Sequence, residues 1–158
     1  MKDLIIRKMQ IGDHTGLKKN IFTEMEMSQI EKNVMTNVRD MKNDNDWVYL
    51  VAEIESEIIG TTYIKFCTSS ASNHVAELFS VVTSKNHLRM GVCRALIDKA
   101  IEIAKERNIE IITLTVRDGT IADTVYQKLG FKIYGVLKNG IKDKDGYFNQ
   151  NYYFLKIG

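Results

Sequence analysis

The chain has 158 residues, of which 44% are hydrophobic and 27% are charged, and its formal net charge is +2. That length is typical of one compact domain with a sizeable core, so we expect a single domain over residues 1–158. The composition excludes a disordered chain, and the scattered charges form no basic stripe. Electrostatics therefore gives no argument for a nucleic-acid partner.

Cysteine usage and hydropathy argue against two further classes of protein. Cys67 and Cys93 are the only cysteines, and their spacing matches no metal-ligand pattern. The Met1-Lys2-Asp3 start does not resemble a secretory signal, and no apolar run approaches the ~20 residues that span a bilayer. We expect a cytoplasmic protein with reduced cysteines, no bound metal and no membrane association.

Changes in apolar periodicity divide the chain into strands and helices. In chain order the expected elements are a strand (4–9), two helices (13–22 and 28–41), three strands (47–54, 58–66 and 75–83), a helix (91–108), a strand (109–116), a helix (120–129) and two strands (131–138 and 147–157). Asp13 is the expected N-cap of the first helix, and KNDND (42–46) ends the second. The β-branched run 109–116 is typical of a strand covered on both faces. This order predicts a mixed α/β domain built on one large sheet with helices on its faces.

The segment HLRMGVCRAL (87–96) leads into the clearest amphipathic helix, whose expected buried face is Val92, Leu96, Ala100, Ile103 and Ala104. Backbone N–H groups at a helix start bind anions, and Gly91 lets a phosphate approach without a Cβ in the way. Arg89 and Arg94 add positive charge. An ordinary loop-to-helix junction explains a lone glycine at least as well, so the segment alone leaves both interpretations open.

The following helix supplies a context for this loop. VYQKLGF (125–131) resembles the L-Y-x-K-x-G-F signature of the Gcn5-related N-acetyltransferases (GNAT). In that family a strand, a Q/R-x-x-G-x-G/A loop and a long helix precede a buried strand and the signature helix. The ending VLKNGIKDKDGYFNQNYYFLKI (136–157) is similar to the family's closing hairpin. The resemblance implies a mostly antiparallel twisted sheet of about six to seven strands with about four helices.

Three positions depart from the family pattern. With Gly91 as the first glycine of the loop, Leu88 stands at the Gln/Arg position and Cys93 at the Gly/Ala position. Gly119 stands where many members carry an asparagine that helps to hold coenzyme A. Cysteine is small enough for a close approach, and Arg89 beside Leu88 supplies a positive charge. These departures concern cofactor affinity more than fold, and we expect a working pyrophosphate loop.

The resemblance implies an acetyl-coenzyme A-dependent N-acetyltransferase, in which a primary amine of a small molecule or peptide attacks the thioester directly. An acyl-enzyme on Cys93 is not expected, because no His–acid pattern accompanies that residue. The residues implied to hold coenzyme A lie at the end of the strand 75–83, in the loop after it and before the signature helix: Val81, Val82, Thr83, Arg89, Met90, Gly91, Val92, Cys93, Arg94 and Gly119.

Two residues match catalytic positions of the family. Tyr126 corresponds to the tyrosine that protonates the departing thiolate, and a phenol with a pKa near ~10 suits that task; packing on the sheet is the structural alternative. Glu77 closes an H-x-x-E arrangement (74–77) and is the candidate general base, with a solvated strand-end carboxylate as an equal alternative. In a regular strand Glu77 shares one face with three later residues: Phe79, Val81 and Thr83.

The sequence leaves several acetyl acceptors and two oligomeric states possible. The stretch 22–27 (FTEMEM) combines acidic and apolar residues and suits a cationic amine such as a polyamine, an aminoglycoside or a peptide N-terminus. A merely solvated loop explains those charges equally well. The aromatic residues of the last strand suit a homodimer interface or the core.

Two other functions compete with the enzyme. Leu88, Cys93 and Gly119 keep open a catalytically silent acyl-coenzyme A-binding regulatory domain of the same fold. A doubly wound nucleotide-binding domain needs a glycine-rich turn after the first strand. QIGDHTG (10–16) fits no such motif, so this class ranks well below the others.

Overall fold

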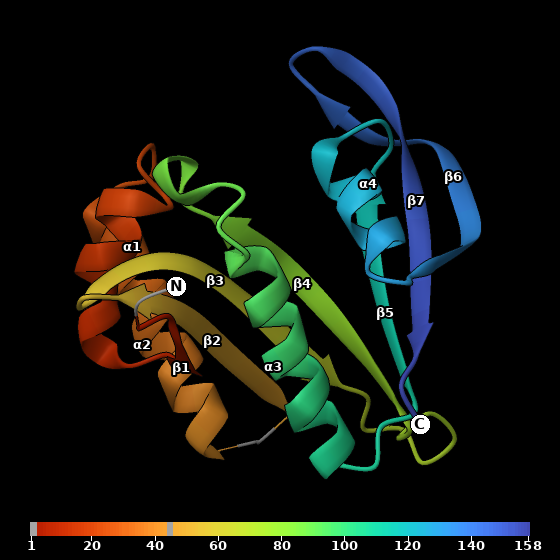
Figure 1. Cartoon of the computed structure of the whole chain (residues 1–158), viewed down its shortest axis with the longest axis horizontal. Coiled ribbons are helices and arrows are strands. Elements are labelled where there is room, and N and C mark those ends of the chain that lie inside the picture. The colour runs from red at the N-terminus through yellow and green to blue at the C-terminus, as the bar shows by residue number, and fades with distance from the viewer. Residues whose placement is uncertain (1–2, 44–45) are drawn as a thin grey trace.

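The computed structural model describes residues 3–43 and 46–158, which form one seven-stranded sheet with four α-helices on its faces (Figure 1). In chain order the elements are β1 (Ile5–Lys8), a 3-10 turn (Ile11–Asp13), α1 (His14–Asn20), α2 (Met27–Asn43), β2 (Trp47–Ile54), β3 (Glu57–Phe66), β4 (Val75–Thr83), a 3-10 turn (Lys85–His87), α3 (Val92–Glu106), β5 (Ile111–Arg117), α4 (Ile121–Lys128), β6 (Lys132–Asp143) and β7 (Gly146–Lys156).

The strand order is β1-β2-β3-β4-β5-β7-β6, and every neighbouring pair is antiparallel except β4 with β5. The predicted fold class, a mixed α/β domain on a mostly antiparallel sheet with helices on its faces, is confirmed. Residues 44 and 45 of the predicted break at 42–46 lie outside the described residues.

Two hydrophobic cores form on the two faces of the sheet. Side chains alternate along β2, so that Tyr49 and Val51 join the core beneath α1 and α2, whereas Val48, Leu50 and Ala52 join the core beneath α3. The larger core also takes in buried side chains of α4, β5 and β7, which places α3 and α4 on the same side of the sheet. Figure 1 shows α1 and α2 beside β1 to β3, and α4 beside β5 and β7.

The predicted apolar face of α3 is buried along the whole helix. Gly60 on β3 allows a close approach, because a Cβ there would lie 2.9 Å from Cγ1 of Val92 and 3.1 Å from Cδ1 of Leu96. Asn108 follows the helix with a φ of 59°, the left-handed conformation expected of it. The close approach at Gly60 thus fixes the position of the start of α3 over β3 and β4.

Asp13 stands at the N-cap position of α1, as expected, but its side chain does not cap the helix. Its carboxylate caps no N–H group of α1. Instead it accepts hydrogen bonds from Nη1 and Nη2 of Arg7 at 2.8 and 2.7 Å and from the Gln10 N–H at 2.7 Å. The guanidinium of β1 offers two parallel charge-assisted bonds, which are stronger than a single bond to a helix N–H.

The strand expected at 109–116 spans Ile111–Arg117 and is fully buried on one face only. Ile112 and Leu114 are buried in the core beneath α3 and α4, whereas the residues between them are partly exposed. The reason is tertiary, because α1 and α2 pack on β3 and β2 and leave the opposite face of β5 partly open.

Replacing Leu96 with alanine tests the larger core. The side chain is 0% exposed, so its truncation should lower the free energy of unfolding by about 3 kcal/mol through lost burial and a residual cavity. Met35→Ala is the control, because that α2 side chain is 54% exposed and its loss should change stability by less than about 0.5 kcal/mol. Urea denaturation measures both variants, and equal changes would contradict the assigned core.

Candidate functional site

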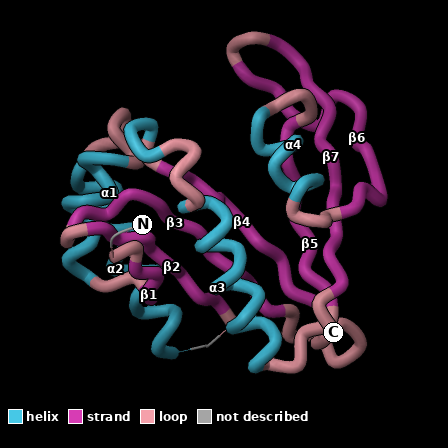
Figure 2. The backbone as a smooth tube through the Cα atoms, in the orientation of Figure 1, coloured by secondary structure: helices cyan, strands magenta, loops and turns pink. Residues whose placement is uncertain are grey.

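β4 and β5 are paired only at their beginnings. The parallel pairs run from Val75 with Ile111 to Glu77 with Thr113, and beyond them the two strands diverge, as Figure 2 shows. From residue 78 onward, the edge of β4 that faces β5 therefore has no strand partner in the described chain. Free N–H and C=O groups at such an edge can pair with an extended ligand.

A β-bulge at Ser80 redirects the side chains in the second half of β4. Ser80 has a φ of 48°, a left-handed conformation that is uncommon for a residue other than glycine. The register with β3 shifts at this point, because Tyr63 lies opposite Phe79 whereas Thr61 lies opposite Val82. Ser80 is thus an extra residue in β4.

The alternation expected along β4 is therefore wrong beyond Phe79. Glu77 and Phe79 face the side of α1 and α2, since their partners on β3 are Lys65 and Tyr63. Val81 instead packs into the core beneath α3. Thr83 lies opposite Gly60, the residue that α3 covers, and also faces α3. One inserted residue reverses the pleat for all that follow.

The diverging strands β4 and β5 leave an opening between them. The segment after β4 places the start of α3 at the wide end of this opening. Arg89 and Gly91 have φ values of 63° and 78°, and Gly91 occupies the N-cap position without a side chain to cap the helix. The first intrahelical bond is from the Ala95 N–H to the Gly91 carbonyl at 2.9 Å. The N–H groups of residues 92–94 precede it and carry the positive end of the helix dipole. This geometry is that of an anion-binding helix start.

Tyr126 lies on α4 with its ring buried among the residues beneath α3 and α4. The side chain is 7% exposed and its ring makes an edge contact with Phe131 at a centroid distance of 5.8 Å. Burial raises the pKa of Tyr126 to about 12, and the nearby Cys93 contributes in the same direction. The structure therefore brings Tyr126 close to the start of α3 and keeps it protonated at neutral pH.

Cys93 is partly buried in the first turn of α3, and burial raises the pKa of its thiol. A neutral thiol is a poor nucleophile. That Cys93 forms no acyl-enzyme stays a prediction, which this environment favours.

Glu77 is the last residue of β4 that is paired with β5. Burial raises the pKa of its carboxyl group, and Lys65 on the neighbouring strand opposes that shift. Glu77 and Lys65 line a cavity of about 240 Å³ with Cys67, Val75, Ala76 and Thr113. Glu77 and Tyr126 lie on opposite faces of the sheet, so the structure does not bring the two predicted catalytic residues together on one face.

Gly119 occupies the turn before α4, where its φ is 69°. Its N–H donates to Oδ2 of Asp123 at 3.2 Å, and a Cβ at Gly119 would meet nothing within 4 Å. The space next to Gly119 is therefore free.

Asp123 holds α4 on β7, a role that no sequence pattern predicts. It accepts a hydrogen bond from the Tyr153 hydroxyl at 2.6 Å and another from the Asn151 amide at 3.2 Å. Burial alone would raise the pKa of Asp123, but these bonds and the one from Gly119 lower it below its usual value. The ionised carboxylate thereby fixes the helix that carries Tyr126.

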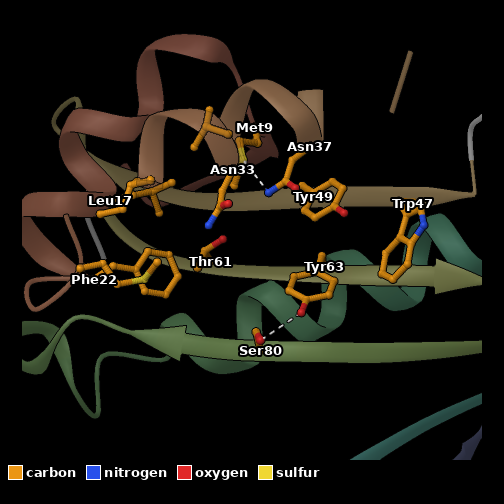
Figure 3. Close-up of a pocket in the computed structure, with 13 residues that line it drawn as sticks. Met9, Leu17, Phe22, Asn33, Asn37, Trp47, Tyr49, Thr61, Tyr63 and Ser80 are labelled. Atoms are coloured by element: carbon orange, nitrogen blue, oxygen red, sulfur yellow. Dashed lines mark hydrogen bonds between the residues drawn. The ribbon is translucent and has the colours of Figure 1, made fainter. Parts of the chain in front are cut away.

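A cavity of about 350 Å³ lies between α1, α2 and the sheet, and sequence reasoning missed it (Figure 3). Its aromatic walls are Phe22, Trp47, Tyr49 and Tyr63, and its polar groups are Asn33, Asn37, Thr61 and Ser80. The remaining lining is aliphatic: Met9, Leu17, Met25, Ile30 and Val34. The alternation of aromatic residues at 47 and 49 was a signal that one face of β2 is aromatic, but only the fold places that face beneath α2.

The acidic loop considered for the acceptor contributes to this cavity only through its apolar residues. Phe22 and Met25 line the cavity, whereas Glu24 and Glu26 are exposed and do not. Ser80 lines it as well and donates a hydrogen bond to the Tyr63 hydroxyl at 3.3 Å. The bulge of β4 therefore joins the aromatic cavity to the unpaired strand edge.

Two features that other functions would need are absent from the part of the chain that the structure describes. In residues 3–43 and 46–158, no helix is long and apolar enough to cross a membrane. Within the same ranges, no three His, Cys, Asp or Glu side chains gather as metal ligands.

The sequence profile of the acetyltransferase (GNAT) family matches residues 19–131. Among curated proteins, no sequence matches the chain. The family match includes α2, the strands β2 to β5, and both helices that border the opening.

Solved structures match the fold over nearly the whole chain. An N-acetyltransferase from Staphylococcus aureus Mu50 has a TM-score of 0.82 at 17% identity, covering 99% of this chain and 100% of its own. A ribosomal-protein-alanine N-acetyltransferase from Brucella melitensis reaches 0.81 at 21% identity, with 97% and 99% covered. A Salmonella typhimurium protein solved with its cofactor acetyl-CoA reaches 0.80 at 13% identity, with 98% and 94% covered. At these identities the likeness shows the fold alone.

Proposed function

The chain belongs to the acetyltransferase (GNAT) family of acetyl-coenzyme A-dependent N-acetyltransferases, and we propose that it acetylates a primary amine by direct attack of the nitrogen on the thioester carbonyl. The observation that carries this proposal is the unpaired edge of β4, which is followed, after a short loop with the 3-10 turn Lys85–His87, by the start of α3. An extended thioester arm, and the pyrophosphate that joins this arm to adenosine, need these two features in that order.

The residues along this path fit coenzyme A. The backbone of Val81, Val82 and Thr83 offers hydrogen bonds to the pantetheine arm, and an N–H of this stretch also serves the thioester carbonyl oxygen. Oγ1 of Thr83 is buried and has no hydrogen-bond partner within the described chain. Residues 89–94 supply the helix N–H groups and two arginines for the pyrophosphate, and the free space at Gly119 accommodates the same molecule.

The chemistry divides between two side chains. The amine nitrogen forms a bond to the carbonyl carbon while the carbon–sulfur bond breaks, and the electron pair leaves with sulfur. Tyr126 donates its proton to that sulfur, for which its buried, protonated phenol is suited. Glu77 removes the amine proton through water, and its place where β4 and β5 separate supports that route. The buried phenol of Tyr126 near the start of α3 favours an enzyme over a silent acyl-coenzyme A-binding domain.

Gly91→Val tests the pyrophosphate site. A branched side chain at the N-cap blocks the approach of the phosphate and is strained at a φ of 78°, so the Kd for acetyl-coenzyme A should rise by about tenfold or more. Calorimetric titration measures the affinity. Gly12→Ala is the control, because its Cβ would meet nothing within 4 Å and binding should be unchanged. An unaltered Kd in Gly91→Val would remove the loop from the cofactor site.

Tyr126→Phe tests the proposed acid. Removal of the hydroxyl should lower kcat by about a hundredfold, the usual contribution of a positioned acid, with little change in cofactor affinity. Thiol release under saturating substrates gives kcat. Tyr134→Phe serves as the comparison, since that ring is 59% exposed on β6. A wild-type kcat in Tyr126→Phe would eliminate the residue as the acid.

Glu77→Gln tests the proposed base. Because burial raises the pKa of Glu77, activity should fall as the pH decreases through that raised pKa, where the carboxylate becomes protonated and cannot accept the amine proton. The variant should be slower and should lack this acidic limb in its profile of kcat/KM against pH. Glu31→Gln, at an exposed site on α2, should retain the limb. A wild-type profile in Glu77→Gln would show that another group accepts the proton.

A further inference from the structure

We propose that the acetyl acceptor is a small primary amine with an uncharged aromatic body, an arylalkylamine, and that this body occupies the aromatic cavity between α1, α2 and the sheet. The proposal rests on the proposed N-acetyltransferase function and narrows its acceptor. It replaces the cationic acceptors that the acidic residues of the α1–α2 loop had suggested.

The cavity has no charged side chain in its lining. A polyamine or an aminoglycoside would lose hydration around its remaining ammonium groups there without gaining a carboxylate partner. One nearby charge is the ammonium group of Lys65, whose Nζ lies 4.9 Å from the ring centroid of Trp47. This charge repels other cations that enter the cavity. Asp40 lies near Tyr49, but its carboxylate pairs with Arg39 at 3.5 Å and is not part of the lining. The lining therefore offers the extra ammonium groups of a polycation no carboxylate partner.

The walls of the cavity suit a planar apolar group. The ring centroids of Trp47 and Tyr49 lie 6.0 Å apart, and those of Tyr49 and Tyr63 lie 5.2 Å apart. These rings form a continuous aromatic surface opposite the aliphatic residues of α1 and α2 (Figure 3). An added ring gains both burial and edge or offset contacts on such a surface. The volume of about 350 Å³ is at the small end of the range for ligand cavities.

One wall of the cavity borders the reacting end of the proposed cofactor path. Ser80 is part of the lining and directly precedes the stretch Val81–Thr83 that is proposed to pair with the pantetheine arm. An amine joined to an aromatic ring by a short alkyl chain can therefore place its nitrogen at Ser80 and its ring against Tyr49 and Trp47. The amides of Asn33 and Asn37 at the α2 side suit a neutral polar substituent on that ring.

Trp47 supplies a direct test, because it is the only tryptophan of the chain and lines the cavity. Titration of the protein with phenethylamine should change its tryptophan fluorescence and saturate at a concentration at least about tenfold below that needed for putrescine or spermidine. Equal or tighter binding of the polyamines, or no saturable change with phenethylamine, would overturn the proposal. The measurement needs no cofactor, so it stands apart from the test of acetyl-coenzyme A binding.

A charge introduced into the lining should reverse the preference. Asn37→Asp places a carboxylate in the cavity with almost no change in shape, and should lower the kcat/KM ratio of phenethylamine to putrescine by about tenfold. Asn73→Asp, in the exposed β3–β4 connection outside the cavity, should leave the ratio unchanged. Equal ratios in the two variants would overturn the assignment of the cavity to the acceptor. Turnover confined to amines of another class would also overturn it while leaving the N-acetyltransferase function intact.

Discussion

The separation of β4 from β5 after Glu77 is the constraint on which the site depends. Where two adjacent parallel strands diverge, their facing backbone donors and acceptors lose their partners. These groups then need hydrogen bonds from another source. An extended thioester arm supplies them and is aligned by the strand edge in return. The same separation places α3 on one side of the opening and α4 on the other, so the anion-binding helix start and the buried Tyr126 face a common space.

Ser80 couples this opening to the acceptor side of the sheet. Its extra residue turns Val81 and Thr83 toward α3, while Phe79 and Ser80 itself remain on the side of α1 and α2. A regular strand would have placed Val81 in the aromatic cavity and removed the polar residue that borders it. The bulge therefore lets one strand serve the cofactor with its edge and the acceptor with its face, at the cost of an uncommon backbone conformation at a serine.

Patterns that are local in the chain were sufficient to predict most of the fold. The apolar periodicity of α3, the left-handed Asn108 and the order of strands and helices follow from contacts within a few residues or from burial of one face. Asp13 shows where prediction from local patterns fails. Its carboxylate can accept hydrogen bonds either from the start of the nearby helix or from the guanidinium of Arg7, and it accepts them from Arg7. The stronger partner lay on another element, and a pattern based on helix caps does not contain it.

By itself, the sequence determined the succession of elements, the loop before α3 and the signature around Tyr126, because each is written in a short run of residues. Only the tertiary structure decided which side chains meet. The aromatic cavity joins residues of α1, α2 and three strands, and the Asp123 anchor joins α4 to β7. The faces of Val81 and Thr83 depend on one residue inserted opposite β3. Such relations arise from register and packing between distant segments, for which neither composition nor periodicity carries a signal.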